Sequence, residues 1–211
     1  NPIEDCLKRI KNFSSVINVN PNGTVAYKNR AKEYENCAEY EQDEQKSEHY
    51  FKKAIKDYSA VIKNDFNNPD NYELRAAAYR NRYAKEQDIQ KAEVYFKKAI
   101  EDYTKAIQKD ANNAQRYFSR ADMYDEWRTQ REKDKEKYLL YCSKAIEDYK
   151  KFIELYEADT AKYNDEQFIF RYQNVAYNYC ELACYTEDGE KSQEYFKTLD
   201  DLKQKFEQLK S

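Results

Sequence analysis

The sequence predicts an all-α protein, because two observations indicate helices and a third arranges them in a repeat. The 211 residues include 2 glycines and 3 prolines, too few for the many turns of a β-sandwich or barrel. Apolar residues recur at helical spacing in 96–113, FKKAIEDYTKAIQKDANN. Nearly the same stretch stands at 51–68, FKKAIKDYSAVIKNDFNN, and a diverged copy at 142–159. A repeated helix of this kind indicates a solenoid, in which each unit packs on its neighbours.

A second repeated stretch alternates with the first and predicts a second helix in each unit. It reads Tyr-x-x-Arg-Ala-x-x-Tyr at 27–34, 72–79 and 117–124, and more loosely YQNVAYNY at 172–179. The spacing i, i+4, i+7 places a small residue between two aromatic rings on one helical stripe. The Asn-Asn pairs at 67–68 and 112–113 tolerate left-handed turn geometry and are predicted to end the helices before them.

In these residues the chain resembles the tetratricopeptide repeat (TPR) family, whose helix A matches Tyr117, Ala121 and Tyr124, and whose helix B matches Ala99, Tyr103 and Ala106. Two features depart from the family pattern. The usual proline after helix B remains only as Pro21, and each unit is about 11 to 12 residues longer than the family's 34. The extra residues lie between the two repeated stretches and are expected to lengthen both helices. A repeat of about 45 residues is also compatible with a HEAT-like solenoid.

The resemblance implies a right-handed α-solenoid of antiparallel helix pairs, a TPR-like superhelix of about nine helices that forms one domain over 1–211. A lone helix at 3–18 precedes four pairs, at 24–64, 69–109, 114–156 and 163–209. The first helix has no partner before it, so either the chain was cut from something longer or this helix caps the array.

Composition excludes several classes of partner and cofactor. A formal charge of −3 and a pI near 5.5 argue against nucleic acid or an anionic membrane as the main partner, and no apolar run is long enough to insert in a membrane. The 5 cysteines lie in helical patterns and are expected to be reduced in the cytoplasm, with a removed N-terminal targeting segment as the open alternative. Cys180 and Cys184 offer half a metal site without a second pair of ligands, so no metal is expected.

The residues for catalysis are missing from the sequence. His49 is the only histidine, and with 2 glycines the chain has no Gly-rich phosphate loop and no HExxH motif. Carboxylate pairs such as Glu101-Asp102 recur from unit to unit, which is typical of solvated helix faces. We therefore expect a protein that is not an enzyme and needs no cofactor.

The resemblance implies instead a non-catalytic adaptor, whose concave groove binds an extended peptide or a helix of a partner protein. Helix A lines this groove in the family, with exposed positions one, five and eight residues after its first aromatic. Carried over, these positions are Lys28, Lys32, Glu35, Glu73, Ala77, Arg80, Phe118, Asp122, Asp125, Gln173, Tyr177 and Cys180.

Two details refine the expected groove. Phe118 and Tyr177 are expected to be exposed aromatic anchors for the partner. The clamp that some family members use for a chaperone's C-terminal carboxylate matches at Lys28 but not at Lys32, Leu74, Gln115 and Ser119, so binding of a chaperone tail is disfavoured.

The alternative function is a structural module that self-associates into a homo-oligomer or links domains of a larger assembly. Leu199, Leu202, Phe206 and Leu209 recur at spacings of 3, 4 and 3, as in a short coiled-coil seam. Such a stripe also packs on the preceding helix of a solenoid. Met123 and Trp127 are expected to fill the core.

Overall fold

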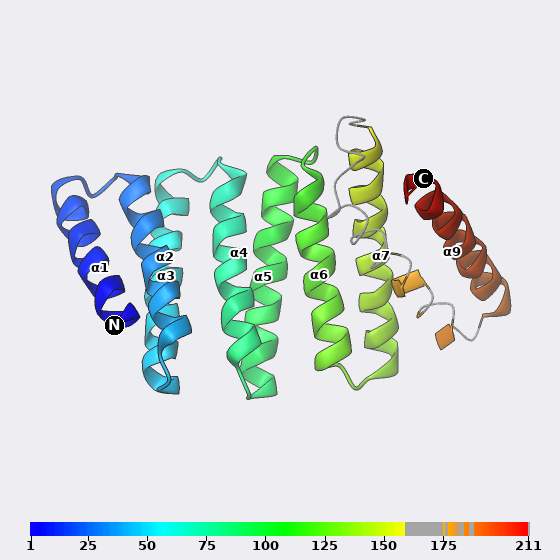
Figure 1. Ribbon diagram of the computed structural model, residues 1–211, viewed down its shortest axis with the longest axis horizontal. Helices are drawn as coiled ribbons and strands as arrows, with labels where there is room; N and C mark the ends of the chain where they lie inside the picture. The colour runs from blue at the N-terminus through cyan, green and yellow to red at the C-terminus, as the bar shows by residue number, and fades with distance from the viewer. Residues whose placement is uncertain (159–174, 176, 180, 182–183, 186–187, 211) are drawn as a thin grey trace. The chain divides into compact units, whose positions relative to one another are not determined.

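The computed structural model describes residues 1–158, 175, 177–179, 181, 184–185 and 188–210, without the side chains of 157, 202, 205, 206, 209 and 210. The chain forms two compact units, Asn1–Asp110 and Ala111–Ser211, and the single domain over 1–211 stays a prediction. The described residues form eight helices and no strands (Figure 1). The all-α prediction is confirmed.

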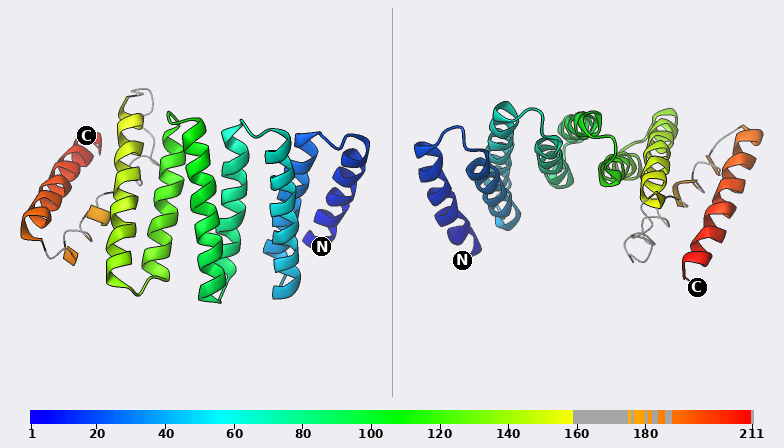
Figure 2. Two further views of the ribbon diagram at one scale, coloured as in Figure 1. Left: turned by 180° about the vertical axis from the view of Figure 1, so that it is seen from behind. Right: turned by 90° about the horizontal axis from the view of Figure 1, so that it is seen from above.

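The first unit contains α1 (Pro2–Val19) followed by two helix pairs. These pairs are α2 (Thr24–Tyr40) with α3 (Glu44–Asn64), and α4 (Pro69–Lys85) with α5 (Ile89–Lys109). Consecutive helices pack against each other from α1 to α5. They run antiparallel, as the views from behind and above also show (Figure 2).

The second unit contains α6 (Ala114–Gln130), α7 (Lys135–Glu157) and α9 (Gly189–Lys210). α6 and α7 form a third helix pair. The helix expected to begin at residue 163 falls mostly outside the described residues. Helices of 17 and 21 residues in the pairs of the first unit accommodate the extra length of each repeat, as the sequence predicts.

The Asn-Asn pairs work differently from the prediction. No residue other than glycine has a positive φ in the described part of the chain, so these asparagines do not adopt the left-handed conformation. Asn68 and Asn113 instead cap the next helix, because their side chains accept hydrogen bonds from the N–H groups of Asp70 and Gln115 at 3.0 Å. The pair therefore marks the beginning of helix A as much as the end of helix B.

The two tyrosine positions of the sequence repeat meet inside each helix pair. The last tyrosine of the helix A stretch stacks on a tyrosine of helix B, the one that stands four residues before the repeated alanine of that helix. The ring centroids lie 5.9 to 6.5 Å apart. The three stacked pairs are Tyr34–Tyr50, Tyr79–Tyr95 and Tyr124–Tyr141, and Tyr179 and Tyr195 lie 6.1 Å apart in a tilted arrangement. Beside these rings the repeated alanines are fully buried, which lets the helices approach closely.

The arginine of Tyr-x-x-Arg-Ala-x-x-Tyr has a structural role that the sequence did not suggest. Arg30, Arg75 and Arg120 each donate two hydrogen bonds, of 2.7 to 2.8 Å, to an aspartate of the following helix B. These partners are Asp57, Asp102 and Asp148, all buried. A bidentate pair of this kind fixes the rotation of helix A against helix B as well as their separation.

Several further expectations can be compared with the described residues. Met123 and Trp127 are buried, so the prediction that they fill the core is confirmed. Cys6, Cys37 and Cys142 are buried and Cys184 is exposed, and none of these four is in a disulfide. Among the described helices, none is long and apolar enough to cross a membrane.

Candidate protein-interaction surface

Six of the predicted groove residues lie on α2 and α4, the A helices of the first unit. We call them the first A-helix surface: Lys28, Lys32, Glu35, Glu73, Ala77 and Arg80. Lys32 is exposed, while Lys28, Glu73, Ala77 and Arg80 are half-buried. The predicted exposure is wrong for Glu35, which is 3% exposed.

Glu35 is buried because it joins three helices of the first unit. Its carboxylate accepts a hydrogen bond of 2.8 Å from the hydroxyl of Tyr58 on α3, and one of 3.0 Å from the amide of Asn81 on α4. Burial raises the pKa of Glu35, although the hydrogen bond from Tyr58 and the charge of Lys32 act to lower it. Glu35 thus forms a polar floor between two neighbouring A helices.

Two lysines, Lys32 and Lys85, lie near the contact between α2 and α4. The ammonium group of Lys32 is 3.8 Å from the carboxylate of Glu35, on a side chain that is 61% exposed. Lys85 of α4 donates a hydrogen bond of 2.8 Å to the backbone carbonyl of Ala38, near the end of α2. Because Lys32 stays largely in solvent, it has donors left for a carboxylate on another molecule.

The second unit carries Phe118, Asp122 and Asp125 on α6, and the prediction that Phe118 is exposed is wrong. Phe118 is 8% exposed, and its ring lies 5.6 Å from that of Tyr149 and 5.3 Å from that of Phe152, both on α7. Asp122 is half-buried and accepts a hydrogen bond of 2.9 Å from the hydroxyl of Tyr149. Phe118 is therefore a core residue and does not serve as an aromatic anchor for a partner.

Tyr177 is exposed, as the sequence predicts, at 57%. Its hydroxyl donates a hydrogen bond of 3.1 Å to Glu181, which helps to orient the ring. Gln173 and Cys180 lie outside the described residues. Leu199 of the predicted self-association seam is 4% exposed, and the side chains of Leu202, Phe206 and Leu209 also lie outside the described residues.

Arg128 organises the polar contacts beside Tyr177, and sequence reasoning missed it. This residue of α6 is 1% exposed, and it donates hydrogen bonds to Glu181 at 2.9 Å and to Asn178 at 2.7 Å. It also pairs with Asp125 at 2.5 Å, three residues earlier on the same helix. The i, i+3 spacing of Asp125 and Arg128 is visible in the sequence, but the burial of Arg128 is not.

The carboxylates around Arg128 have shifted pKa values. Burial raises the pKa of Asp125, against the opposing effect of the Arg128 charge. Burial also acts to raise the pKa of Glu181, but hydrogen bonds from Tyr138 and Arg128 lower it overall. Glu181 is thus held as a carboxylate beside Tyr177.

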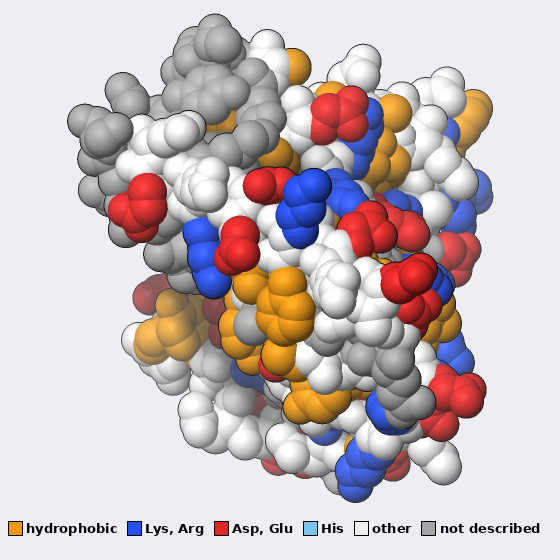
Figure 3. Space-filling model, turned by 90° about the vertical axis from the view of Figure 1, so that its right-hand side faces the viewer, with side chains coloured by type: hydrophobic (Ala, Val, Ile, Leu, Met, Phe, Trp, Pro, Cys, Tyr) orange, Lys and Arg blue, Asp and Glu red, His pale blue; other side chains and the backbone are white. Residues whose placement is uncertain are grey.

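No cluster of three or more His, Cys, Asp or Glu side chains that could hold a metal occurs among the described residues. A different face of the molecule, the one at the right-hand side of Figure 1, carries interspersed acidic and basic side chains with hydrophobic side chains grouped between them (Figure 3).

No protein-family model matches the chain, and no curated protein matches it. Two crystal structures of MamA are similar in fold. One has a TM-score of 0.58 and 19% identity over 96% of this chain and 85% of that chain, and the other 0.55 and 18% over 93% and 87%. A thermophilic TPR protein of Thermus thermophilus gives a TM-score of 0.45 and 14% identity over 94% and 97%. MamA is a TPR protein, so the TPR-like fold that the sequence predicts is confirmed.

Proposed function

We propose that the protein is a non-catalytic interaction scaffold, whose A helices bind a helical or extended segment of a partner protein. The observation that carries this proposal is the bridge from Glu35 to Tyr58 and Asn81, at 2.8 and 3.0 Å. Through Asn81 it joins α2 and α4, the two A helices that carry the first A-helix surface. A surface that is ordered before binding loses less entropy when the partner arrives.

The residues on this surface favour a partner segment with an acidic side chain. Lys32 is exposed and Lys28 is half-buried one helical turn earlier on α2. Ala77 on α4, the neighbouring A helix, is half-buried and has no side chain beyond Cβ. We infer that a carboxylate of the partner pairs with Lys32, while an apolar side chain packs near Ala77.

Tyr177 supports a second contact area on the other unit. An exposed tyrosine whose hydroxyl is already hydrogen-bonded presents a rigid ring, which interfaces use as an anchor.

The test is a comparison of proteins captured by immobilised wild type, by K28E/K32E and by the control K56E/K63E. The control makes the same change of charge on exposed residues of α3, a B helix of the same unit. We expect a partner that K56E/K63E retains and K28E/K32E loses, identified by mass spectrometry and confirmed with purified components. Equal capture by all three proteins contradicts a role for the first A-helix surface. Sedimentation velocity of the purified chain tests the alternative of self-association.

A further inference from the structure

Cys6 of α1 and Cys37 of α2 are packed together inside the first unit. Both are 0% exposed and belong, with Ile10, to one buried hydrophobic cluster. The side chains of Tyr34 and Tyr50 pack against this cluster. The structure thus brings together two thiols that stand 31 residues apart in the sequence.

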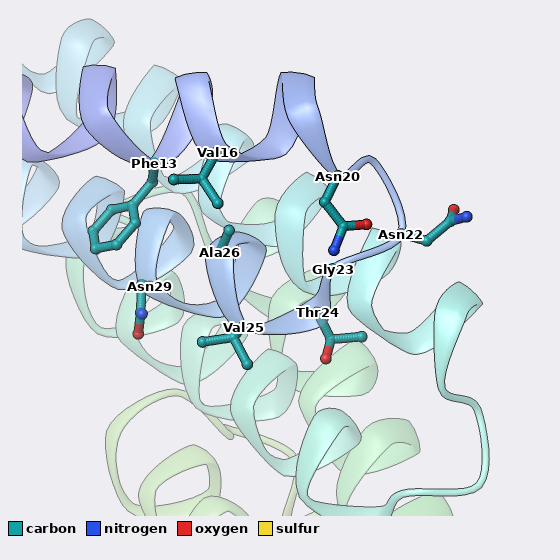
Figure 4. A pocket seen from close by; sticks show the side chains of 9 residues that line it. All are labelled: Phe13, Val16, Asn20, Asn22, Gly23, Thr24, Val25, Ala26 and Asn29. Carbon is teal, nitrogen blue, oxygen red and sulfur yellow. The ribbon is translucent and has the colours of Figure 1, made fainter.

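The antiparallel register of α1 and α2 explains this contact. Phe13 of α1 and Asn29 of α2 line the same pocket near the loop between the helices, and Figure 4 shows Phe13 directed toward α2. Four residues earlier on α1 and four later on α2, Arg9 and Glu33 form an ion pair of 2.8 Å. One further helical turn in the same direction reaches the two cysteines, so the pairing of the helices places them opposite each other.

Arg9 and Glu33 provide polar groups beside Cys6. The guanidinium of Arg9 donates a hydrogen bond of 3.3 Å to the sulfur of Cys6. Burial acts to raise the pKa of Glu33, but hydrogen bonds, above all that from Arg9, lower it overall, so Glu33 is a carboxylate. An arginine beside a cysteine is one of the surroundings in which thiols become reactive.

The two thiols differ in their access to solvent and in their surroundings. Burial, together with the neighbouring Cys6, raises the pKa of Cys37 to about 12, so Cys37 keeps its proton at neutral pH. Cys6 contacts a group that borders solvent, because the side chain of Arg9 is 47% exposed. A small oxidant can reach Cys6 when Arg9 is displaced by a local opening. Cys6 is therefore the thiol that meets an oxidant first.

We propose that Cys6 and Cys37 are a redox modification site, at which a hydroperoxide forms a disulfide between α1 and α2. The sulfur of Cys6 attacks one peroxide oxygen, the O–O bond breaks, and Cys6 becomes a sulfenic acid while water or an alcohol leaves. The sulfur of Cys37 then displaces the hydroxyl, which departs as water with the proton of Cys37. The two thiols lose two electrons in total, and the peroxide takes them up. A dithiol reverses the reaction by thiol–disulfide exchange.

The disulfide has a physical consequence for the first unit. A bond between positions 31 residues apart restricts the unfolded chain far more than the folded one, in which the two helices already pack together. The oxidised protein should therefore unfold at a higher temperature than the reduced protein. This proposal does not depend on the first A-helix surface.

The test treats the purified, reduced chain with hydrogen peroxide, blocks the remaining thiols with N-ethylmaleimide and maps the peptides by mass spectrometry. We expect a cross-linked pair of peptides that contain Cys6 and Cys37, which dithiothreitol separates. The control C184A removes an exposed thiol outside the cluster and should leave this cross-link unchanged. Oxidation should raise the melting temperature of the wild type but not that of C37A.

Single substitutions separate the roles of the neighbouring groups. Dimedone, which labels sulfenic acids, should mark Cys6 in C37A and leave Cys37 unlabelled in C6A. R9Q should slow formation of the cross-link at least about fivefold, whereas K8Q, at the neighbouring exposed position, should change the rate less than about twofold. Circular dichroism and the melting temperature establish that the variants fold.

The outcomes distinguish a built site from chance proximity. A folded chain that forms no cross-link, or forms it only in urea, overturns the proposal. Oxidation of Cys6 to the sulfinic acid in the wild type while Cys37 stays a free thiol also overturns it. Equal rates in R9Q and K8Q overturn the assignment of Arg9 to the reaction.

Discussion

Arg75 of α4 donates two hydrogen bonds to Asp102 of α5, at 2.7 and 2.8 Å, and a third, of 3.0 Å, to the hydroxyl of Ser59 on α3. Arg30 makes the same contacts to Asp57 and Ser14 in the preceding repeat. Each arginine therefore joins its own helix pair to helix B of the repeat before it. The side chain that identifies the repeat in the sequence also links the repeats in the structure.

Loss of this link should cost much stability. Arg75→Ala leaves Asp102, whose side chain is 2% exposed, without its charge partner. Breaking a buried ion pair in this way costs about 3 to 5 kcal/mol. Urea unfolding should thus show a large loss of unfolding free energy. The control Lys105→Ala removes an exposed ion pair with Glu101 on the same α5 and should cost less than about 0.5 kcal/mol. Equal losses in the two variants would sink this role for Arg75.

Glu35 should make stability depend on pH. Because burial raises the pKa of Glu35 in the folded protein, the fold retains a proton that the unfolded chain releases. Stability therefore falls as pH rises from the ordinary glutamate pKa through the raised value. Glu35→Gln keeps an oxygen that accepts the Tyr58 hydrogen bond but has no group that titrates, so it should flatten this dependence.

The matched control for this pH effect is Glu39→Gln, an exposed position on the same helix. Its melting temperature should follow that of the wild type across the pH series. If Glu35→Gln also follows the wild type, the buried carboxylate does not carry the pH dependence.

Alanine substitution should lower stability strongly at Phe118 and hardly change it at Tyr177. Phe118→Ala removes a ring packed against Tyr149 and Phe152, and a buried aromatic lost in this way costs about 3 to 5 kcal/mol. Tyr177→Ala alters an exposed ring and should change stability by no more than about 0.5 kcal/mol. Once a partner is known, Tyr177→Ala should weaken its binding. Unchanged stability in Phe118→Ala would mean that this ring is not part of the core.

The cysteines should differ in reactivity toward a thiol reagent. Burial raises the pKa of Cys37 to about 12 and that of Cys142 to about 11, so both stay as protonated thiols at neutral pH. Cys184 is exposed. Iodoacetamide followed by peptide mapping should modify Cys184 on the order of a hundredfold faster than Cys37 or Cys142 in the native protein. Comparable rates before denaturation would contradict the burial of the two thiols.

The candidate surface was less predictable than the fold. The resemblance to the family assigns positions one, five and eight of helix A to the groove. That pattern does not include the contacts that the neighbouring helices make. Glu35 is buried because Tyr58 and Asn81, 23 and 46 residues away in sequence, both donate to it. Phe118 is buried because α7 brings two rings against it. Neither contact follows from the helical spacing of α2 or α6 alone.

What the sequence by itself determined is the all-α, paired architecture. The tyrosines and alanines of the two repeated stretches recur at helical spacing, and burying that stripe requires neighbouring helices of the same kind. The tertiary structure alone decided which polar residues are structural and which are accessible. Arg75, Glu35 and Arg128 look like solvated charges in a periodic sequence. They are fixed by partners on other helices, and burial makes those pairings strong because little water competes for them.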